Sequence, residues 1–304
     1  MNIVITGGAG FIGSHLAERL LKNNNVFVID NLSTGRKENI TSKNIKLYKE
    51  SIHKEKIMRG IFEETNPDIV IHCAASYKDP KNWKEDAKTN VVGTINMVKE
   101  SIKHNVKHFI YFQTALTYGK AQEQPITLNH PINPSCSYAI SKTAAEQYID
   151  MSGLNYTTFR LANAYGPRNL SGPAPTFYNR LTKNLPCFVF NTRRDFVYID
   201  DLVDIVMKSI NDEIMGVYHI STGKDFAIKD IYDEVCKNLE IESDVEVKEP
   251  LPGDEKTILI DPSKTLEVFG FIPNKTLEYG IKKAVEWYKK NGIKETFTHL
   301  DMKD

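Results

Sequence analysis

The chain has 304 residues, 41% of them hydrophobic, which suits a folded protein with one large domain or two unequal lobes. Lys plus Arg and Asp plus Glu both number 39, so no net charge favours nucleic acid or an acidic membrane surface. No apolar run approaches the roughly 20 residues of a bilayer span, and no signal pattern opens the chain. We therefore expect a cytoplasmic protein without nucleic-acid or membrane partners.

The first half of the chain alternates short β-rich runs with amphipathic stretches. The β-rich runs are NIVIT (2–6), NVFVID (25–30), IKLYKE (45–50), DIVIHCA (68–74) and HFIYF (108–112). Helical patterns stand between them, the longest ending at His104. A further helix is expected over 135–151 and a sixth strand over 156–162. This rhythm predicts an α/β fold, a doubly wound parallel sheet of the Rossmann type.

A glycine-rich turn follows the first strand. In TGGAGFIG, Gly7, Gly10 and Gly13 are spaced G-x-x-G-x-x-G, and Phe11 and Ile12 open an amphipathic helix. Glycine permits the tight turn and the close approach of backbone to a phosphate, and the helix N-terminus favours an anion. The turn therefore predicts a pyrophosphate site, and a plain glycine turn is the alternative.

An acidic residue ends the second strand. Asp30 stands about 20 residues after the glycines, where a carboxylate accepts hydrogen bonds from both ribose hydroxyls of a dinucleotide and repels a 2′-phosphate. This predicts NAD as the cofactor. Arg36 and Lys37 nearby keep NADP as an alternative.

Tyr138 and Lys142 in SYAISK lie at i and i+4, on one face of a predicted helix. An ammonium beside a phenol, with a positive nicotinamide ring, is expected to lower the tyrosine pKa from about 10 toward neutrality and to make it a general base. Thr114 falls at the carboxyl end of the fifth strand, where ligands of such sheets bind. We expect its hydroxyl to contact a substrate oxygen. The alternatives are a chance surface pair and an ordinary strand residue.

Four cysteines are scattered singly, without C-x-x-C pairs or a histidine at ligand spacing. Neither a metal site nor a disulfide framework is expected. Prolines at 167, 173, 175 and 186 break the rhythm of the second half. We therefore expect an NAD-binding domain over 1–165 and a smaller, interleaved α/β substrate lobe over 166–304. DFVYI and GVYHI are short strands expected to return to the main sheet.

Over nearly its whole length the chain resembles the extended short-chain dehydrogenases/reductases, in the NAD-dependent sugar-nucleotide epimerase/dehydratase family. The motifs that carry the resemblance are TGGAGFIGSHL, VIDNLSTG, HCAA, TNVVGT, QTALTYG, SYAISK, RLANAYGPR, RRDFVYIDD and PGD. Within the family the chain is similar to bacterial UDP-hexose 4-epimerases of lipopolysaccharide O-antigen clusters. This implies polysaccharide biosynthesis, a UDP-sugar substrate such as UDP-glucose or UDP-galactose, and a homodimer formed by the helices near 82–104 and around Tyr138.

Family members that dehydrate or decarboxylate a sugar carry an acid just after the Ser or Thr. Here the matching positions are Ala115 and Leu116, which cannot carry a proton. The resemblance therefore implies a UDP-sugar 4-epimerase, which oxidises and re-reduces C4 of a UDP-hexose with tightly bound NAD. The alternatives are an NAD(P)H-dependent nucleotide-4-ketosugar reductase and a non-catalytic dinucleotide-binding sensor or scaffold.

The resemblance also implies further binding residues. On the cofactor side these are Asn31, Ala74, Ala75, Asn90 and the catalytic pair Tyr138 and Lys142, with mere helix packing as the alternative for Asn90. On the substrate side Asn163 and Arg194 match diphosphate contacts, and Arg193 is the alternative to its neighbour. Lys78 is placed near an acidic or acylated sugar and Asp254 near the uridine, with solvent and a turn as their alternatives.

Overall fold

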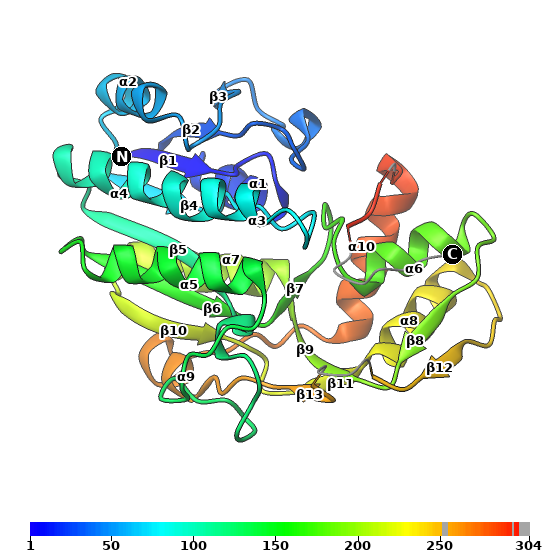
Figure 1. The fold of residues 1–304 in the computed structure, drawn as a ribbon. Coiled ribbons are helices and arrows are strands. Elements are labelled where there is room, and N and C mark those ends of the chain that lie inside the picture. The colour runs from blue at the N-terminus through cyan, green and yellow to red at the C-terminus, as the bar shows by residue number, and fades with distance from the viewer. Residues whose placement is uncertain (251–254, 294, 298–304) are drawn as a thin grey trace. The chain divides into compact units, whose positions relative to one another are not determined.

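The computed structural model describes residues 1–250, 255–293 and 295–297, and the chain divides into two compact units (Figure 1). The first unit comprises Met1–Gly119, Pro131–Arg160 and Val203–Tyr218, and the second comprises Lys120–His130, Leu161–Leu202 and His219–Asp304. The chain therefore passes between the units several times. One passage, after Arg160, lies near the cut that we placed after residue 165.

The first unit is built around a seven-stranded sheet of order β10-β6-β5-β4-β1-β2-β3. The pairs from β5 to β3 are all parallel. The doubly wound parallel sheet that the alternation predicts is confirmed. Its strands are β1 (Asn2–Thr6), β2 (Asn25–Ile29), β3 (Lys46–Tyr48), β4 (Ile69–His72), β5 (His108–Thr114), β6 (Tyr156–Leu161) and β10 (Gly216–Ile220).

Helices cover the sheet of the first unit on both sides. The main helices are α1 (Phe11–Leu20), α2 (Glu55–Thr65), α4 (Thr94–Lys103), α5 (Ser137–Asp150) and α7 (Ile199–Asn211), of which α7 belongs to this unit from Val203 on. Two short 3-10 turns, η1 (Lys37–Asn39) and η3 (Ala115–Tyr118), lie in the connections of this unit. Phe62 of α2, Met97 of α4 and Ala145 of α5 share one buried cluster with Val4 and Phe109 of the sheet. The strands are continuous apolar runs because both of their faces are buried.

The long helical pattern that ends at His104 is not one regular helix. It consists of α3 (Trp83–Asp86), a π-helical segment η2 (Ala87–Gly93) and α4. The side chain of Asn82 caps α3 by accepting a hydrogen bond from the backbone N–H of Glu85 at 3.2 Å. Single π-helical turns often occur at functional positions.

The second unit holds two smaller sheets. In the first, β11 (Asp225–Ala227), β9 (Arg193–Tyr198) and β13 (Thr257–Ile258) lie in order, and β7 (Asn163–Tyr165) also pairs with β9. The second sheet pairs β8 (Phe188–Phe190) with β12 (Glu246–Lys248). The remaining helices are α6 (Pro173–Leu181), α8 (Ile228–Leu239), α9 (Ser263–Phe269) and α10 (Leu277–Asn291), and α6, α8 and α10 pack together.

The two segments expected to return to the main sheet behave differently. GVYHI forms β10 at the edge of the seven-stranded sheet, as expected. The expectation for DFVYI is wrong, because β9 pairs with β7, β11 and β13 in the smaller sheet.

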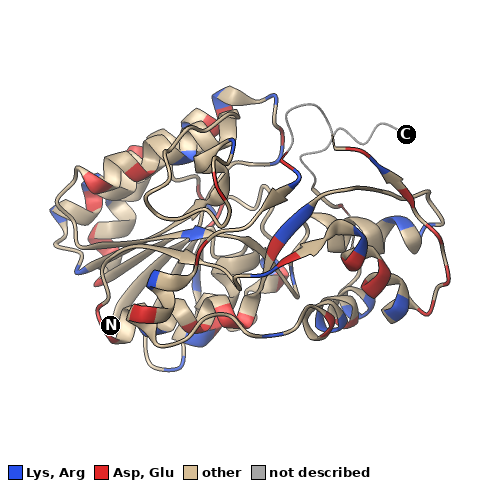
Figure 2. Cartoon of the chain, turned by 90° about the horizontal axis from the view of Figure 1, so that it is seen from below, with Lys and Arg blue, Asp and Glu red and all other residues tan. Residues whose placement is uncertain are grey.

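Charge is distributed evenly over the molecule. Figure 2 shows basic and acidic residues interspersed along the helices, in agreement with the balanced composition of 39 residues of each sign. Within the described ranges, no helix has the length and the apolar character needed to cross a bilayer.

Candidate functional site

The glycine-rich turn packs too closely for any side chain. Gly7 has a φ of +66°, and a Cβ there would lie 2.7 Å from the backbone nitrogen of Ala74. A Cβ on Gly13 would lie 2.5 Å from the Gly7 carbonyl oxygen. The Gly10 N–H donates to that same carbonyl at 3.0 Å and α1 begins at the next residue. The N–H groups of Phe11, Ile12 and Gly13 therefore start the helix without intrahelical acceptors, and this cradle fits a pyrophosphate.

Asp30 follows β2 and is 7% exposed. Its carboxylate accepts hydrogen bonds from the N–H of Ala9 at 3.0 Å and the N–H of Leu32 at 2.8 Å. Burial raises the pKa of this carboxyl, and the backbone donors act in the opposite direction. A Cβ on Gly35 would lie 2.8 Å from both carboxylate oxygens, so the loop after β2 closes tightly around Asp30. Asp30 thus holds the glycine turn in place, and its contact to a ribose stays a prediction.

The other residues expected near the cofactor lie in the loops after β2 and β4, and two of them hydrogen-bond to neighbouring segments. Asn31 is exposed and its side chain donates to Ser51 Oγ at 3.1 Å. Ala74, two residues after β4, donates its N–H to Thr6 Oγ1 at 3.2 Å and packs against Gly7. Ala75 is the next residue of this loop and is half-buried.

Asn90 is 2% exposed in the π-helical segment η2. Its Oδ1 accepts from the Ser76 N–H at 2.7 Å. Its Nδ2 donates to the Ser76 carbonyl at 3.0 Å and to Ser141 Oγ at 2.9 Å. Asn90 therefore joins the loop after β4 to α5, a scaffolding position between the cofactor loop and the helix of Tyr138.

Lys142 is buried on α5, with 3% of its surface exposed. Its Nζ lies 3.9 Å from the centroid of the Tyr111 ring, and the Tyr111 hydroxyl donates to the Lys142 carbonyl at 3.0 Å. Burial lowers the pKa of Lys142 to about 7, while Cys73 and Glu146 act to raise it. Burial therefore makes the Lys142 ammonium easier to deprotonate than that of an exposed lysine.

Tyr138 is half-buried, one turn before Lys142 on the same helix. Burial raises the pKa of its phenol, and Tyr77, Cys136 and Asp86 raise it further. In the protein alone the pKa of Tyr138 is thus above its usual value, because loss of hydration dominates at the phenol oxygen, and the fall expected beside a bound nicotinamide stays a prediction.

Thr114 is the last residue of β5 and is half-buried. Its Oγ1 accepts from the N–H of Leu116 at 3.2 Å, which caps the short turn η3. Thr117 in that turn and Thr143 on α5 share a hydrogen bond of 2.7 Å. The segment after Thr114 is therefore tied to the helix that carries Tyr138 and Lys142.

A buried polar network behind Thr114 was not found from the sequence. The Gln113 side chain accepts from the Thr114 N–H at 2.9 Å and donates to Glu146 at 2.9 Å. Glu146 pairs with Arg160 at 3.1 Å, and Arg160 donates to the Tyr118 hydroxyl at 2.9 Å. The one available signal is that Glu146 follows Lys142 by four residues and so shares its helix face.

A buried histidine was also missed. His72, at the end of β4, lies 2.7 Å through Nδ1 from Thr6 Oγ1 and 2.9 Å through Nε2 from Thr94 Oγ1. Burial lowers its pKa to about 3, so the ring is neutral. It links β1, β4 and α4, and its partner Thr6 directly precedes the glycine turn and accepts from the Ala74 N–H.

The remaining predicted site residues are not all in the first unit. Lys78 is exposed in the loop after β4, whereas Asn163 on β7 and Arg194 on β9 belong to the second unit. The Asn163 side chain donates to the Asp195 carbonyl at 3.1 Å. Asp254 lies outside the described residues.

The two neighbouring arginines of β9 have different partners. Arg193 makes a two-pronged contact with the Asp225 carboxylate, at 2.9 and 3.2 Å. Arg194 donates to the carbonyls of Arg193 at 2.8 Å and Lys256 at 3.3 Å. Successive strand residues point to opposite faces, so the two guanidinium groups diverge.

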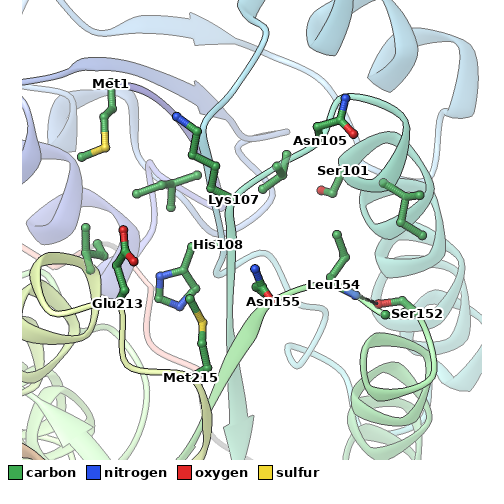
Figure 3. Close-up of a pocket in the computed structure, with 15 residues that line it drawn as sticks. Met1, Ser101, Asn105, Lys107, His108, Ser152, Leu154, Asn155, Glu213 and Met215 are labelled. Carbon is green, nitrogen blue, oxygen red and sulfur yellow. Dashed lines mark hydrogen bonds between the residues drawn. The ribbon is translucent and has the colours of Figure 1, made fainter.

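A cavity of about 610 Å³ lies in the first unit, at the amino ends of β4 and β5 (Figure 3). Its lining includes Met1, Ser101, Lys107, His108 and Glu213, and none of the predicted site residues. Ligands of open α/β sheets bind beyond the carboxyl ends of the strands, where Gly7 and Thr114 stand. The cavity is therefore at the amino ends of the strands, and the candidate active site is at their carboxyl ends.

Comparisons with known proteins place this site in a family. The model of the "NAD dependent epimerase/dehydratase family" matches residues 3–221. A "Putative UDP-glucose 4-epimerase" of Methanocaldococcus jannaschii is 32% identical over 310 residues, which cover 95% of this chain and 99% of that one. The Bordetella bronchiseptica enzyme WbmH in complex with NAD+ is 43% identical, with a TM-score of 0.93 and coverage of 96% and 99%. WbmG of the same organism, in complex with NAD and UDP, is 39% identical, with a TM-score of 0.91 and coverage of 99% and 97%. The chain belongs to the NAD dependent epimerase/dehydratase family.

Proposed function

We propose that the protein is an NAD-dependent UDP-hexose 4-epimerase. The observation that carries the proposal is the end of β5, where Thr114 is followed by Ala115 and Leu116 rather than by an acid. On α5, Tyr138 supplies the proton acceptor and Lys142 the positive charge that stabilises its phenolate. Positions 115 and 116 hold no acid that could transfer a proton at a second carbon of the sugar. Such a site is equipped to oxidise and re-reduce one carbon. The UDP-glucose 4-epimerase names among the relatives agree with this chemistry.

The cofactor is held by the first unit. The glycine turn and the first N–H groups of α1 bind the pyrophosphate, and Asp30 accepts hydrogen bonds from the ribose hydroxyls. A buried carboxylate there disfavours a 2′-phosphate, so NAD is preferred to NADP. When bound, NAD supplies the acceptor for the C4 hydrogen and a positive ring that favours a nearby phenolate.

The chain's own residues handle the proton. Tyr138 takes the proton of the sugar O4 as C4 is oxidised and returns it when C4 is reduced. The Lys142 ammonium favours the phenolate through its charge, and the Thr114 hydroxyl holds the same sugar oxygen. The re-reduction on the other face of C4 gives the epimer.

The nucleotide and the sugar are assigned to the remaining residues. We assign the diphosphate to Asn163 and to Arg194 rather than Arg193, because Arg193 is engaged by Asp225. Lys78 is assigned to the hexose and Asp254 to the uridine side. We also propose a role in polysaccharide biosynthesis, which the resemblance to O-antigen-cluster enzymes supports.

We further propose a homodimer formed by α4 and α5. The two helices pack against each other, and α5 with its C-terminal cap exposes a stripe of Ile140, Tyr148 and Met151, which are 53%, 41% and 76% exposed. Val92 and Ile102 add exposed apolar surface on the neighbouring helical segment. The same pair of helices from a second copy would cover this stripe.

The test is conversion without added cofactor. Purified protein should contain bound NAD and interconvert two UDP-hexoses when only the sugar nucleotide is supplied. The anomeric proton signals of a panel of UDP-sugars, followed by NMR, identify the hexose. Turnover that depends on added NADPH and a keto sugar would contradict the proposal in favour of a ketoreductase.

A further inference from the structure

Asp86 is a buried carboxylate one turn before Asn90, and none of the predicted roles includes it. It is the last residue of α3 and is 1% exposed. Its Oδ1 accepts from Ser76 Oγ at 3.0 Å, and its Oδ2 accepts from Ser137 Oγ at 2.7 Å. Ser137 is the first residue of α5 and directly precedes Tyr138.

The two segments that Asp86 joins are joined again one helical turn later. Asn90 binds the backbone of Ser76 through both of its side-chain atoms and donates to Ser141 Oγ. Asp86 and Asn90 thus fix the loop after β4 to the first two turns of α5. Tyr138 lies between the two anchored positions, Ser137 and Ser141.

A buried carboxylate in this place is stabilised by its surroundings. Each oxygen accepts a hydroxyl hydrogen bond, and the free N–H groups at the start of α5 favour a negative charge. Removing a hydroxyl partner leaves part of the carboxylate unpaired, which is costly in a buried site. The contact to Ser137 therefore constrains the start of α5 firmly.

We infer that Asp86 is a positioning residue for Tyr138, because its carboxylate clamps the first turn of α5 to the loop after β4. The inference rests on the proposed function, in which Tyr138 is the proton acceptor. Asp86 touches neither the sugar nor the cofactor in this account, and it acts through Ser137 and through its charge.

The charge gives the inference a signature that a purely structural contact lacks. After burial, the groups that raise the pKa of Tyr138 are Tyr77 in the loop after β4, Cys136 before α5 and Asp86 itself. Tyr111 of β5 also interacts with the Tyr138 phenol. Lys142, on the same helix, is the cation. Of the three groups that raise the pKa of Tyr138 in addition to burial, Asp86 is the one carboxylate. Removing its negative charge should therefore lower the pKa of the phenol.

The experiment compares three variants by the pH dependence of kcat. Asp86→Asn keeps the size and removes the charge, and its amide NH2 donates to one of the two serine hydroxyls where the carboxylate accepted. The rise of kcat with pH, which reports the phenolate, should move to lower pH by about half a unit or more. Ser137→Ala keeps the charge and breaks one arm of the clamp. It should lower kcat about tenfold with little change in KM and leave the position of the pH profile in place.

Glu85→Gln is the matched control. Glu85 is on the same short helix, with 41% of its side chain exposed, and its carboxylate accepts from Thr89. The pH profile and kcat of this variant should equal those of the wild type. An Asp86→Asn profile that coincides with the wild-type profile would overturn the inference, as would full kcat in Ser137→Ala.

Failure of the proposed function is distinguishable from failure of this inference. A wild-type chain that converts no UDP-hexose contradicts the function. The inference is then decided by the ionisation of Tyr138, followed as the ultraviolet difference absorption between each chain and its Tyr138→Phe counterpart. An unchanged ionisation midpoint in Asp86→Asn overturns the inference, and a lower midpoint supports it.

Discussion

The Tyr138 phenol carries the proton chemistry, so its loss should affect turnover more than binding. We expect Tyr138→Phe to lower kcat by about 10²- to 10⁴-fold, because the phenyl ring cannot take the O4 proton. The amount of bound NAD should stay close to that of the wild type, since the pyrophosphate and ribose contacts lie on other elements. Steady-state kinetics and the absorbance of the released cofactor measure both quantities.

Tyr148→Phe is the control for this change, because Tyr148 is on the same helix and is 41% exposed. Its kcat should equal that of the wild type. A Tyr138→Phe chain with unchanged kcat would show that another group accepts the proton.

At the residue scale, the sequence predicts which side chains meet better than it predicts their electrostatics. Spacing alone places Tyr138 and Lys142 on one helix face, and the structure has them there. The rise of the Tyr138 pKa in the protein without cofactor was not predicted, because burial depends on what packs around α5. Asp86 was missed for the same reason, since its partners are 10 and 51 residues away in the sequence.

Within one element, β9, two adjacent arginines should differ in function. We expect Arg194→Lys to raise the KM for the UDP-sugar about tenfold, because lysine lacks the planar fork that matches a diphosphate. Arg193→Lys is the matched control, and its KM should stay near the wild-type value because Arg193 is engaged by Asp225. Initial rates over a range of substrate concentrations measure both. The opposite pattern would assign the diphosphate to Arg193.

Strand β9 also contains a carboxyl group, Asp195, whose titration makes the stability of the folded protein depend on pH. Asp195 is 1% exposed and accepts hydrogen bonds from Ser221 and Thr222. Burial raises its pKa from 3.8 to about 6, against the opposing effect of these donors. Because the folded-state pKa is above the unfolded-state value, its contribution to stability is fully present below about pH 4 and is lost as the pH rises through about 6.

We therefore expect the free energy of unfolding of the wild type, relative to Asp195→Asn, to fall between about pH 4 and pH 6. The fall should be at most about 3 kcal/mol, the equivalent of a pKa difference of about two units. Urea unfolding of both chains across this range measures it. A difference that is constant with pH would show that Asp195 titrates normally.

Helices and strands were predicted well where their hydrophobic pattern is compatible with only one sheet. The alternation of runs identified β1 to β6 and α5, because buried parallel strands need continuous apolar stretches. DFVYI was assigned to the wrong sheet, since a short apolar strand fits either sheet and its partners β7, β11 and β13 are themselves only two or three residues long. The π-helical segment η2 has the composition of an ordinary helix and gave no signal.

At the scale of the whole molecule, the proposed dimer predicts a change in mass. We expect Ile140→Glu to yield monomers, because a charge in the middle of the apolar stripe on α5 cannot be buried against a second copy. Light scattering should give twice the mass of one chain for the wild type and the mass of one chain for the variant. Ile57→Glu is the control, because Ile57 is 40% exposed on α2 and should leave the dimer intact. A monomeric wild type would contradict the proposal.

The two-unit organisation was only partly readable from the sequence. The proline-rich region after Asn163 marks the change from one rhythm to another, and the second unit takes over at Leu161. The exchange of residues 120–130 and 203–218 between units depends on long-range packing, which no local pattern reports.

The central claim is that one carbon of the sugar is oxidised and re-reduced without proton exchange elsewhere on the ring. The direct test is conversion of a UDP-hexose in deuterated water without added cofactor, with the products analysed by NMR. The account predicts interconversion of the two C4 epimers without solvent deuterium at C4, because the hydride removed from C4 is the one returned to it. It also predicts no deuterium at C5, because Ala115 and Leu116 carry no exchangeable acid to that region. Deuterium at C5 would show that an unidentified acid–base group works there and would contradict the account.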